Sequence, residues 1–327
     1  MTVTAAKPVT ILTGFLGAGK TTFLNALIAY KKDQKLAVIE NEYGQEGIDG
    51  ELVICTNDNL FELNNGCLCC TLNEDFYSLL EVLWNGKDEF DELVIETTGI
   101  ANPASVAAPF LTNASVPYYY KLKRVICLVD ARNVEQQLQE TEEARNQISF
   151  SDILLITKTD TIDADHLNRI EKLLRGINPF AVVLSGNQNH YPFEEIYDAP
   201  RKAVIQVNLP KSGGHTFGMQ HQRHQHQDLV SLSFNFTEAF DLQLLSHRLT
   251  VFLNFQAKDV YRVKGIFNIK GQQQKIIIQS VMNDLAVAAG EDWADDAVRN
   301  SRIVFIGKNL EPAGFEKMLK QCFYQRT

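Results

Sequence analysis

The chain has fewer positive than negative charges, and it has no long apolar run. Lysine and arginine number 31 against 40 aspartates and glutamates, which leaves a net charge of −9. Proteins that bind nucleic acid need a basic footprint for the phosphates, so this deficit argues against a nucleic-acid partner. No apolar run approaches the length that crosses a bilayer, and the N-terminus lacks the charged-then-apolar pattern of a secretion signal. We therefore expect no membrane partner and a cytoplasmic location.

The six cysteines are unevenly placed. Three of them, Cys67, Cys69 and Cys70, lie within four residues. In a reducing compartment such clustering indicates metal binding or redox chemistry, not a disulfide framework. The rest of the composition is ordinary for a globular protein, with 45% hydrophobic and 22% charged residues. A length of 327 residues is enough for two domains that each have a core.

One stretch, Gly14-Phe15-Leu16-Gly17-Ala18-Gly19-Lys20-Thr21, fits the phosphate-binding pattern G-x-x-x-x-G-K-[ST] at every constrained position. It follows an apolar run typical of a buried strand and precedes apolar residues at helical spacing. Backbone N–H groups and the helix dipole then converge on an anion, Lys20 reaches the β- and γ-phosphates, and Thr21 ligates Mg²⁺. The candidate nucleotide-binding residues of this stretch are Gly14, Gly17, Ala18, Gly19, Lys20, Thr21 and Thr22.

Two further predicted strands end in acidic residues. The first runs into Glu40-Asn41-Glu42-Tyr43-Gly44, which is either a switch segment that offers carboxylate ligands or a polar strand-to-loop transition. The second ends in Glu96-Thr97-Thr98-Gly99, where the carboxylate would organise Mg²⁺ and the Gly99 N–H would meet the γ-phosphate. The candidate catalytic residues are therefore Lys20, Thr21 and Glu96.

The cysteine cluster lies between these two motifs, at a predicted strand-to-helix turn. Thiolates are soft ligands suited to Zn²⁺ or Cu(I), and the dipole of the following helix lowers their pKa. Buried structural cysteines or a redox pair are the alternatives, but three cysteines in a tetrapeptide favour a metal. Three sulfur atoms leave a tetrahedral site incomplete, and Glu40, Glu42 or an exchangeable donor would complete it.

A later predicted strand leads into Thr157-Lys158-Thr159-Asp160, which is similar to the guanine-reading motif N-K-x-D. Asp160 would accept hydrogen bonds from the guanine N1–H and amino group, whereas adenine would leave this carboxylate unpaired. The stem of Lys158 would lie along the base. Thr157 cannot imitate the asparagine amide, and a solvated loop is the alternative interpretation. The motif predicts GTP as the nucleotide.

The alternation of strands and helices predicts an α/β fold, a doubly wound and mostly parallel P-loop sheet flanked by helices, over residues 1–208. Residues 209–228 are a His- and Gln-rich linker that holds His215, His221, His224 and His226. These histidines are either a mobile metal-collecting tether or part of a flexible spacer. Residues 229–327 predict a smaller α+β domain.

Taken together, the motifs resemble the CobW-type GTPases of the CobW/HypB/UreG superfamily, which are metallochaperones. The resemblance covers nearly the whole chain, and the C-x-C-C motif between the two phosphate motifs is specific to the group. It implies a transition metal on Cys67, Cys69 and Cys70, usually zinc, with Glu40 or Glu42 nearby. Gln45 departs from the family pattern, in which a glutamate is common, so any such metal role is lost or moves to Glu46.

The expected activity is slow GTP hydrolysis, coupled to capture and delivery of a transition metal to client metalloproteins. GTP or GDP, Mg²⁺ and Zn²⁺ are the expected cofactors, with Co²⁺ or Ni²⁺ as other cargo. One alternative is a metal buffer or sensor with a structural nucleotide. Others are an ATP-dependent, kinase-like enzyme and a chaperone for cobalt in cobalamin or nitrile hydratase maturation. Assembly into a homo-oligomer is possible on this sequence.

Overall fold

The structure, a computed structural model, describes residues 5–40, 52–56, 59–63, 74–202, 229–256, 259–282, 284–294 and 298–325. The chain separates into two compact units. The first is formed by Met1–Arg175 and Phe180–Val207, and the second by Gly176–Pro179 and Asn208–Thr327. The predicted linker, residues 209–228, lies outside the described residues.

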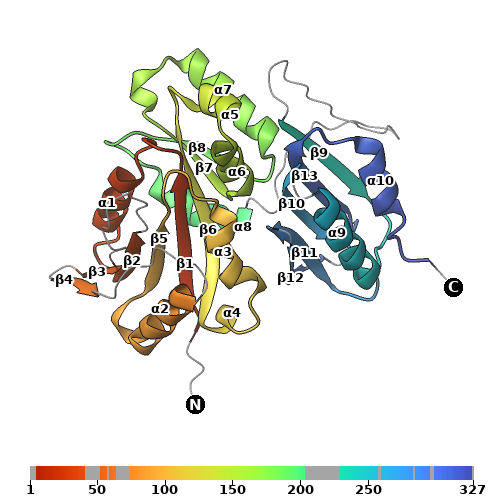
Figure 1. Cartoon of the computed structure of the whole chain (residues 1–327), viewed down its shortest axis with the longest axis horizontal. Coiled ribbons are helices and arrows are strands. Elements are labelled where there is room, and N and C mark those ends of the chain that lie inside the picture. Colours follow the sequence, from red (N-terminus) through yellow and green to blue (C-terminus); the bar gives the residue numbers. More distant parts are fainter. Residues whose placement is uncertain are drawn as a thin grey trace. The chain divides into compact units, whose positions relative to one another are not determined.

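The first unit is built on an eight-stranded sheet with the order β4-β3-β2-β5-β1-β6-β7-β8 (Figure 1). The strands from β2 to β8 in this order are parallel, whereas β3 and β4 are added antiparallel at one edge. Their bounds are β1 Lys7–Gly14, β2 Leu36–Glu40, β3 Leu52–Thr56, β4 Asn59–Leu63, β5 Glu92–Glu96, β6 Tyr120–Asp130, β7 Ile153–Thr157 and β8 Val182–Ser185.

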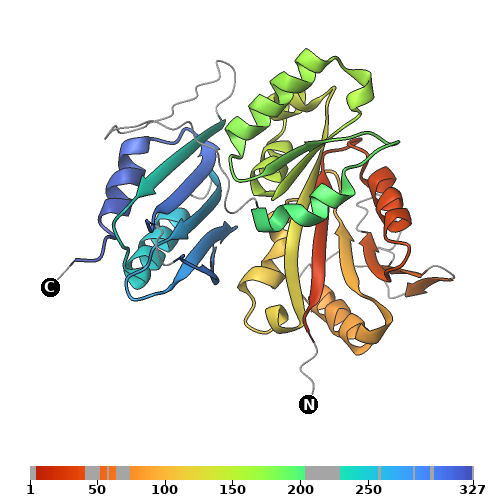
Figure 2. The same ribbon diagram turned by 180° about the vertical axis from the view of Figure 1, so that it is seen from behind.

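Helices cover both faces of this sheet because its strands are apolar on both sides. In β1, Ile11 packs into one core with α2, α3, α4 and α6, and Leu12 packs into the other with α1 and α8. Figure 2 shows α8 in green in front of the second face. The helices are α1 Lys20–Tyr30, α2 Glu74–Asn85, α3 Pro103–Thr112, α4 Val116–Tyr119, α5 Val134–Glu140, α6 Glu142–Phe150, α7 Ala164–Ile177 and α8 Phe193–Lys202. The prediction of a doubly wound sheet is confirmed.

Strand register brings the predicted motifs to one edge of the sheet. Leu12 of β1 is the register partner of Glu96 in β5, and Glu40 of β2 is the partner of the same Glu96. On the other side of β1, Gly14 is paired with Leu128 of β6. Because parallel strands end at a common edge, the phosphate-binding loop and the two acidic strand ends are neighbours.

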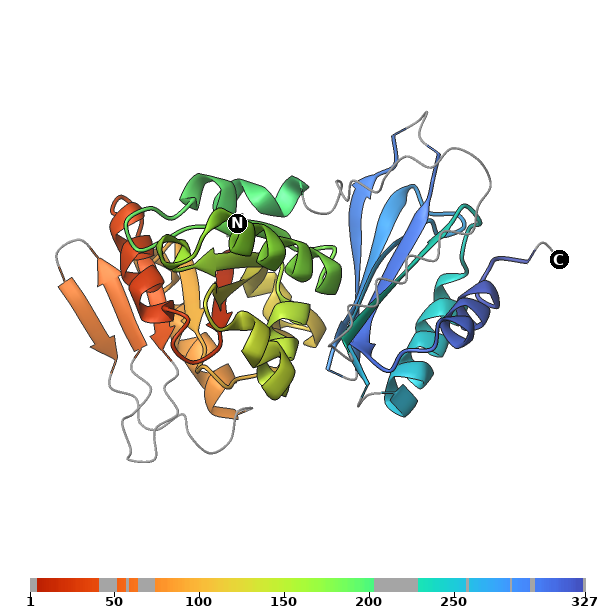
Figure 3. The ribbon, with the colours of Figure 1, turned by 90° about the horizontal axis from the view of Figure 1, so that it is seen from above.

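The second unit is a five-stranded antiparallel sheet with the order β12-β11-β10-β13-β9. Its helices α9 and α10 lie on one face of the sheet, as Figure 3 shows, and their apolar residues share one core with the strands. The elements are β9 Leu229–Phe236, α9 Leu242–Gln256, β10 Val260–Phe267, β11 Gln274–Val281, β12 Asp284–Asp292, β13 Ser301–Lys308 and α10 Pro312–Lys320. This is the α+β domain that the sequence predicts.

One strand of this unit was not expected. β12 pairs with β11 along nearly its whole length, although its sequence is rich in alanine and carries a glycine and acidic residues, which are uncommon in strands. Pairing with an apolar neighbour outweighs this weak local preference. In the part of the chain that the structure describes, every helix is too short or too polar to cross a membrane.

Candidate functional site

The loop between β1 and α1 has the backbone shape of an anion-binding loop. Gly17 and Gly19 have φ angles of 75° and 93°, in the left-handed region where glycine is unstrained. No described atom lies within 4 Å of the place where a Cβ would stand at either residue, so open space adjoins the loop. Gly14 differs, because a Cβ there would lie 2.5 Å from the Leu128 carbonyl oxygen. Only glycine fits at this position, where the chain turns from β1 into the loop that leads to the N-terminus of α1.

Lys20 and Thr21 begin α1 and face the loop. The Lys20 Nζ donates a hydrogen bond to the Gly14 carbonyl oxygen at 2.9 Å. Burial lowers the pKa of Lys20, and the negative charge of Glu96 opposes this shift. The Thr21 Oγ1 donates to the Glu96 Oε1 at 3.2 Å. Two oxygen ligands at a helix N-terminus are a donor set that suits Mg²⁺, so the residues present fit this ion.

Ala18 and Thr22 are the two remaining predicted nucleotide-binding residues of the stretch. Ala18 is buried, and its N–H donates to the Phe15 carbonyl oxygen at 3.1 Å, which closes the loop. Thr22 is exposed on the first turn of α1. The structure therefore keeps Thr22 accessible to a ligand and uses Ala18 for the shape of the loop.

The turn after β5 lies against the phosphate-binding loop. The Thr97 N–H donates to the Leu12 carbonyl oxygen at 2.9 Å, and its hydroxyl donates to Thr13 Oγ1 at 3.0 Å. A Cβ on Gly99 would stand 2.8 Å from the Leu16 backbone nitrogen and 2.4 Å from its side chain. Only glycine, which has no Cβ, allows the backbone at position 99 to lie this close to the phosphate-binding loop.

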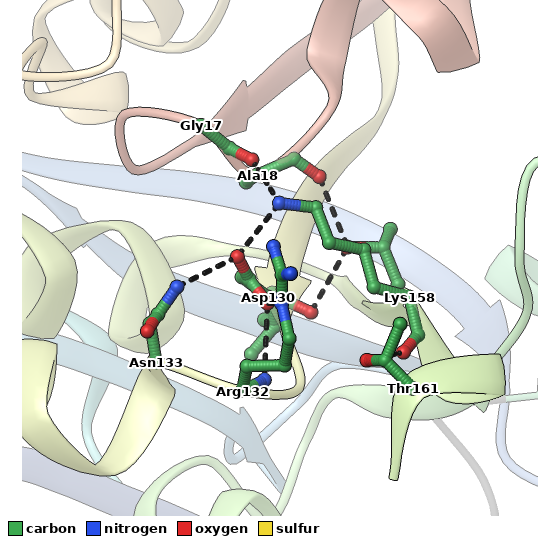
Figure 4. Close-up of polar contacts among 9 residues, drawn as sticks. Gly17, Ala18, Asp130, Arg132, Asn133, Lys158 and Thr161 are labelled. Atoms are coloured by element: carbon green, nitrogen blue, oxygen red, sulfur yellow. Dashed lines mark hydrogen bonds and ion pairs between the residues drawn. The ribbon is translucent and has the colours of Figure 1, made fainter.

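The predicted base-reading segment is tied to the same loop, as Figure 4 shows. The Lys158 Nζ donates to the Gly17 carbonyl oxygen at 2.6 Å and to Asp130 Oδ2 at 2.7 Å. The buried Thr157 hydroxyl lies 2.9 Å from the Ala18 carbonyl oxygen, to which it donates. Thr157 therefore supplies the structural link between the two motifs, whatever it lacks toward the base.

Asp130, at the end of β6, is a site residue that the sequence reasoning missed. Besides Lys158, its carboxylate accepts hydrogen bonds from the Arg132 N–H and the Asn133 amide, each at 3.0 Å (Figure 4). Burial alone would raise the pKa of Asp130, but the bonds from Lys158 and Arg132 outweigh it and hold the pKa below its usual range. The signal was present in the sequence, because Asp130 ends a buried parallel strand just as Glu40 and Glu96 do.

Asp160 lies in the short 3₁₀ turn Thr159–Thr161, and its side chain is exposed. The Thr159 hydroxyl donates to the Gly186 carbonyl oxygen at 3.1 Å, which joins this turn to the loop after β8. This bond holds the turn that carries Asp160 after the carboxyl end of β7, at the edge of the sheet that carries the phosphate-binding loop.

Of the predicted transition-metal ligands, the structure describes Glu40, which ends β2 and is half-buried. The others lie outside the described residues: Cys67, Cys69, Cys70, Glu42, His215, His221, His224 and His226. Within the described ranges, no three His, Cys, Asp or Glu side chains are grouped so that they would hold a metal ion. The cysteine site and the histidine tether stay predictions.

A second residue that the sequence reasoning missed is Gln147 on α6. Its Nε2 lies 3.1 Å from the Gly99 carbonyl oxygen and 3.2 Å from the Ala101 carbonyl oxygen, and donates to both. A single glutamine in an amphipathic helix gives no sequence signal, so only the fold shows that it reaches the turn after β5.

A glycine loop that joins a strand to a helix, with lysine and threonine at the helix start and an acidic strand end beside them, defines the P-loop class of nucleotide-binding proteins. Residues 8–185 match the family described as CobW/HypB/UreG, nucleotide-binding domain. Residues 229–323 match the cobalamin synthesis protein cobW C-terminal domain. The chain belongs to the CobW/HypB/UreG family, and the resemblance inferred from the motifs is confirmed.

Individual relatives match along most of the chain. The zinc chaperone YjiA of Escherichia coli K12 is 30% identical over 306 residues, which cover 92% of this chain and 94% of the relative. The zinc chaperone CobW of Pseudomonas aeruginosa is 28% identical over an alignment of 361 residues. The alignment covers 98% of this chain and 92% of the relative. A crystal structure described as Zn(II)-bound YjiA GTPase from E. coli matches with a TM-score of 0.74 at 26% identity, over 98% of this chain and 100% of that one.

Proposed function

We propose that this chain is a GTPase that couples its nucleotide state to the capture and delivery of a transition metal, with zinc as the first candidate. The observation that supports this most strongly is the match to YjiA along nearly the whole length of both chains. YjiA carries the name of a zinc chaperone, and its crystal structure is described as that of a Zn(II)-bound GTPase.

Hydrolysis depends on positioning and charge at the phosphate-binding loop. Mg²⁺, when bound with the nucleotide, neutralises charge that develops on the phosphates. Thr21 and Glu96, whose oxygens are 3.2 Å apart, would hold it directly or through water. Lys20 now donates to the Gly14 carbonyl and has a stem flexible enough to turn toward the β- and γ-phosphates. These groups would stabilise the transition state by charge and hydrogen bonding, without a covalent intermediate between the protein and the phosphate.

The preference for guanine rests on Asp160. Its exposed carboxylate accepts from the two guanine donors, N1–H and the 2-amino group, which adenine does not offer at those positions. Thr157 and Lys158 hold this segment against the phosphate-binding loop. The segment that would bind the base and the loop that would bind the phosphates are thus joined by direct hydrogen bonds.

The coupling to metal runs through the end of β2. Glu40 is the register partner of Glu96, so a carboxylate predicted for the metal site and one predicted for the Mg²⁺ site end neighbouring strands. A change at Glu96 on loss of the γ-phosphate would be transmitted to Glu40 and to the residues that follow it. Any such coupling is reciprocal, because metal must then change nucleotide affinity by the same factor.

The recipient of the metal would be a client metalloprotein. The relatives include proteins named zinc-regulated GTPase metalloprotein activator 1, one of them from Schizosaccharomyces pombe at 37% identity over 185 residues, 54% of this chain and 45% of that relative. This name supports a client that is itself a metalloprotein. A cytoplasmic place of action and assembly into a homo-oligomer stay predictions.

The test measures GTP turnover and zinc binding on the same samples of three proteins: wild type, Lys20→Ala, and a variant with Cys67, Cys69 and Cys70 all changed to Ser. We expect Lys20→Ala to lose turnover and keep stoichiometric zinc. The cysteine variant should lose tight zinc binding and keep basal turnover. ATP should compete poorly with GTP in the wild type.

Three results would contradict the proposal. Turnover that survives in Lys20→Ala would place hydrolysis elsewhere, and a wild type without turnover would favour the metal buffer or sensor. Zinc retained by the cysteine variant would show that other residues bind the metal. A variant that also lacks His215, His221, His224 and His226 tests directly whether the linker binds it.

A further inference from the structure

Gln147 is a fully buried polar residue in the first unit. It lies on α6 and packs beside the turn that follows β5. Its Nε2 donates to the carbonyl oxygens of Gly99 and Ala101, at 3.1 and 3.2 Å. Two acceptors fix the orientation of the amide, because only the NH₂ end of the side chain can donate to carbonyl groups.

The turn that Gln147 contacts is held from two sides. On one side, Thr97 bonds to the Leu12 carbonyl oxygen and Gly99 lies against the Leu16 backbone. On the other side, the Gln147 amide holds the carbonyls before and after Ile100. Within the turn, the Ala101 N–H donates to the Thr98 carbonyl oxygen at 3.2 Å. Gly99 is therefore clamped between the phosphate-binding loop and α6.

The other end of the same side chain carries a cost. Among the described residues, none donates a hydrogen bond to the buried Gln147 Oε1. An unsatisfied buried oxygen destabilises the fold, and an apolar side chain of similar size would pack here without that penalty. The two donor bonds to the turn are the compensation that the structure shows.

We propose that Gln147 is the positioning residue for the γ-phosphate, because it holds Gly99 so that its N–H is ready to meet that phosphate. This inference rests on the proposed function as a GTPase and deepens it: Gln147 sets how well the protein distinguishes GTP from GDP. Without the amide, the turn populates other conformations. The apparent affinity for GTP then falls in proportion to the fraction of molecules whose turn is in the conformation that binds the γ-phosphate. GDP has no γ-phosphate, so its affinity does not depend on Gly99.

The experiment compares wild type with Gln147→Met, which keeps the length and loses the donors, and with Gln147→Asn, which keeps the amide and shortens it. Dissociation constants are measured for GDP and for a non-hydrolysable GTP analogue, both with Mg²⁺. For Gln147→Met we expect the analogue to bind about tenfold more weakly, as loss of two neutral hydrogen bonds implies, and GDP to change less than about twofold. Gln147→Asn should shift the same ratio by less.

The control is Phe150→Leu, a substitution of a buried core residue on the same helix. It should lower the melting temperature and leave the GDP-to-analogue ratio unchanged. Gln147→Asn is the milder change and keeps the test open where Gln147→Met does not fold. The GTP concentration that gives half-maximal turnover should rise in both Gln147 variants, whereas turnover at saturating GTP should change less, because bound GTP selects the competent turn.

Equal weakening of both nucleotides in the Gln147 variants would show a merely structural role and overturn the proposal. An unchanged ratio, or tighter binding of the analogue, would overturn it as well. The failure of this inference can be told apart from the failure of the proposed function. If the wild type hydrolyses GTP and every Gln147 variant keeps the wild-type ratio of GDP to analogue affinity, only this inference is refuted. If the wild type binds neither nucleotide, both are refuted.

Discussion

We predict that the choice of base depends on Asp160. We predict that Asp160→Asn lowers GTP affinity by about a hundredfold, because the amide is uncharged and has one accepting oxygen where the carboxylate has two. Xanthosine triphosphate has a carbonyl in place of the 2-amino group and should bind the variant better than the wild type, since the asparagine amide donates. Competition binding measures both. Asp165→Asn, at an exposed position on α7, is the matched control and should change neither affinity.

Asp130 makes the stability of the site depend on pH. Its pKa lies below the ordinary aspartate value of about 3.9, so its bonds to Lys158 and Arg132 stabilise the folded state above that value and are lost as the pH falls through the lower native pKa. We predict that Asp130→Asn costs about 1–3 kcal/mol at pH 7. Urea unfolding of both proteins between pH 7 and pH 3 tests this. A gap that stays constant down to pH 3 would contradict it.

Single residues differ in how far the sequence alone could reveal them. Lys20, Thr21 and Gly99 belong to patterns whose spacing reflects chemistry, so their placement around one loop could be predicted. Asp130 ends a buried parallel strand, and this position is a usable signal. Gln147 could not be found, because its role arises from α6 lying beside a turn 46 and 48 residues away in the chain.

At the scale of elements, the turn between β1 and α1 depends on Gly14. We predict that Gly14→Ala lowers the free energy of unfolding by about 2–4 kcal/mol, because the backbone is left-handed there and the methyl group would collide with the Leu128 carbonyl oxygen. Urea unfolding measures the change. Gly314→Ala is the control: it lies within α10 with open space around it, and it should be neutral or stabilise by about 0.5–1 kcal/mol. Equal effects of the two substitutions would contradict the steric explanation.

The elements themselves were largely predictable where their pattern was strong. The parallel strands are short continuous apolar runs, and the apolar stripe Phe76, Leu79, Leu80 and Leu83 of α2 is buried as its spacing requires. β12 could not be predicted, because its residues have a weak intrinsic preference for strands. Its pairing with β11 stabilises it, and that pairing is visible only in the fold. Nor does the sequence show that β3 and β4 extend the sheet antiparallel beside β2.

At the scale of the whole molecule, the account joins two chemistries in one chain. The predicted nucleotide site is built from described residues, and Glu40, which begins the segment predicted to bind metal, is the register partner of Glu96. The alternation of strands and helices was enough to predict the class of fold, and the resemblance of the motifs to CobW-type GTPases was enough to predict the family. The coupling itself could not be read from the sequence, because it depends on a difference in free energy between two nucleotide states.

The central claim is that nucleotide state and metal affinity change together. The most direct measurement is a calorimetric titration of Zn²⁺ into the reduced protein, once with GDP and once with a non-hydrolysable GTP analogue, both with Mg²⁺. We predict zinc affinities that differ by at least about fivefold, the lower end of measured couplings, and nucleotide affinities that change by the same factor when zinc is present. Equal zinc affinities in the two nucleotide states would contradict the account.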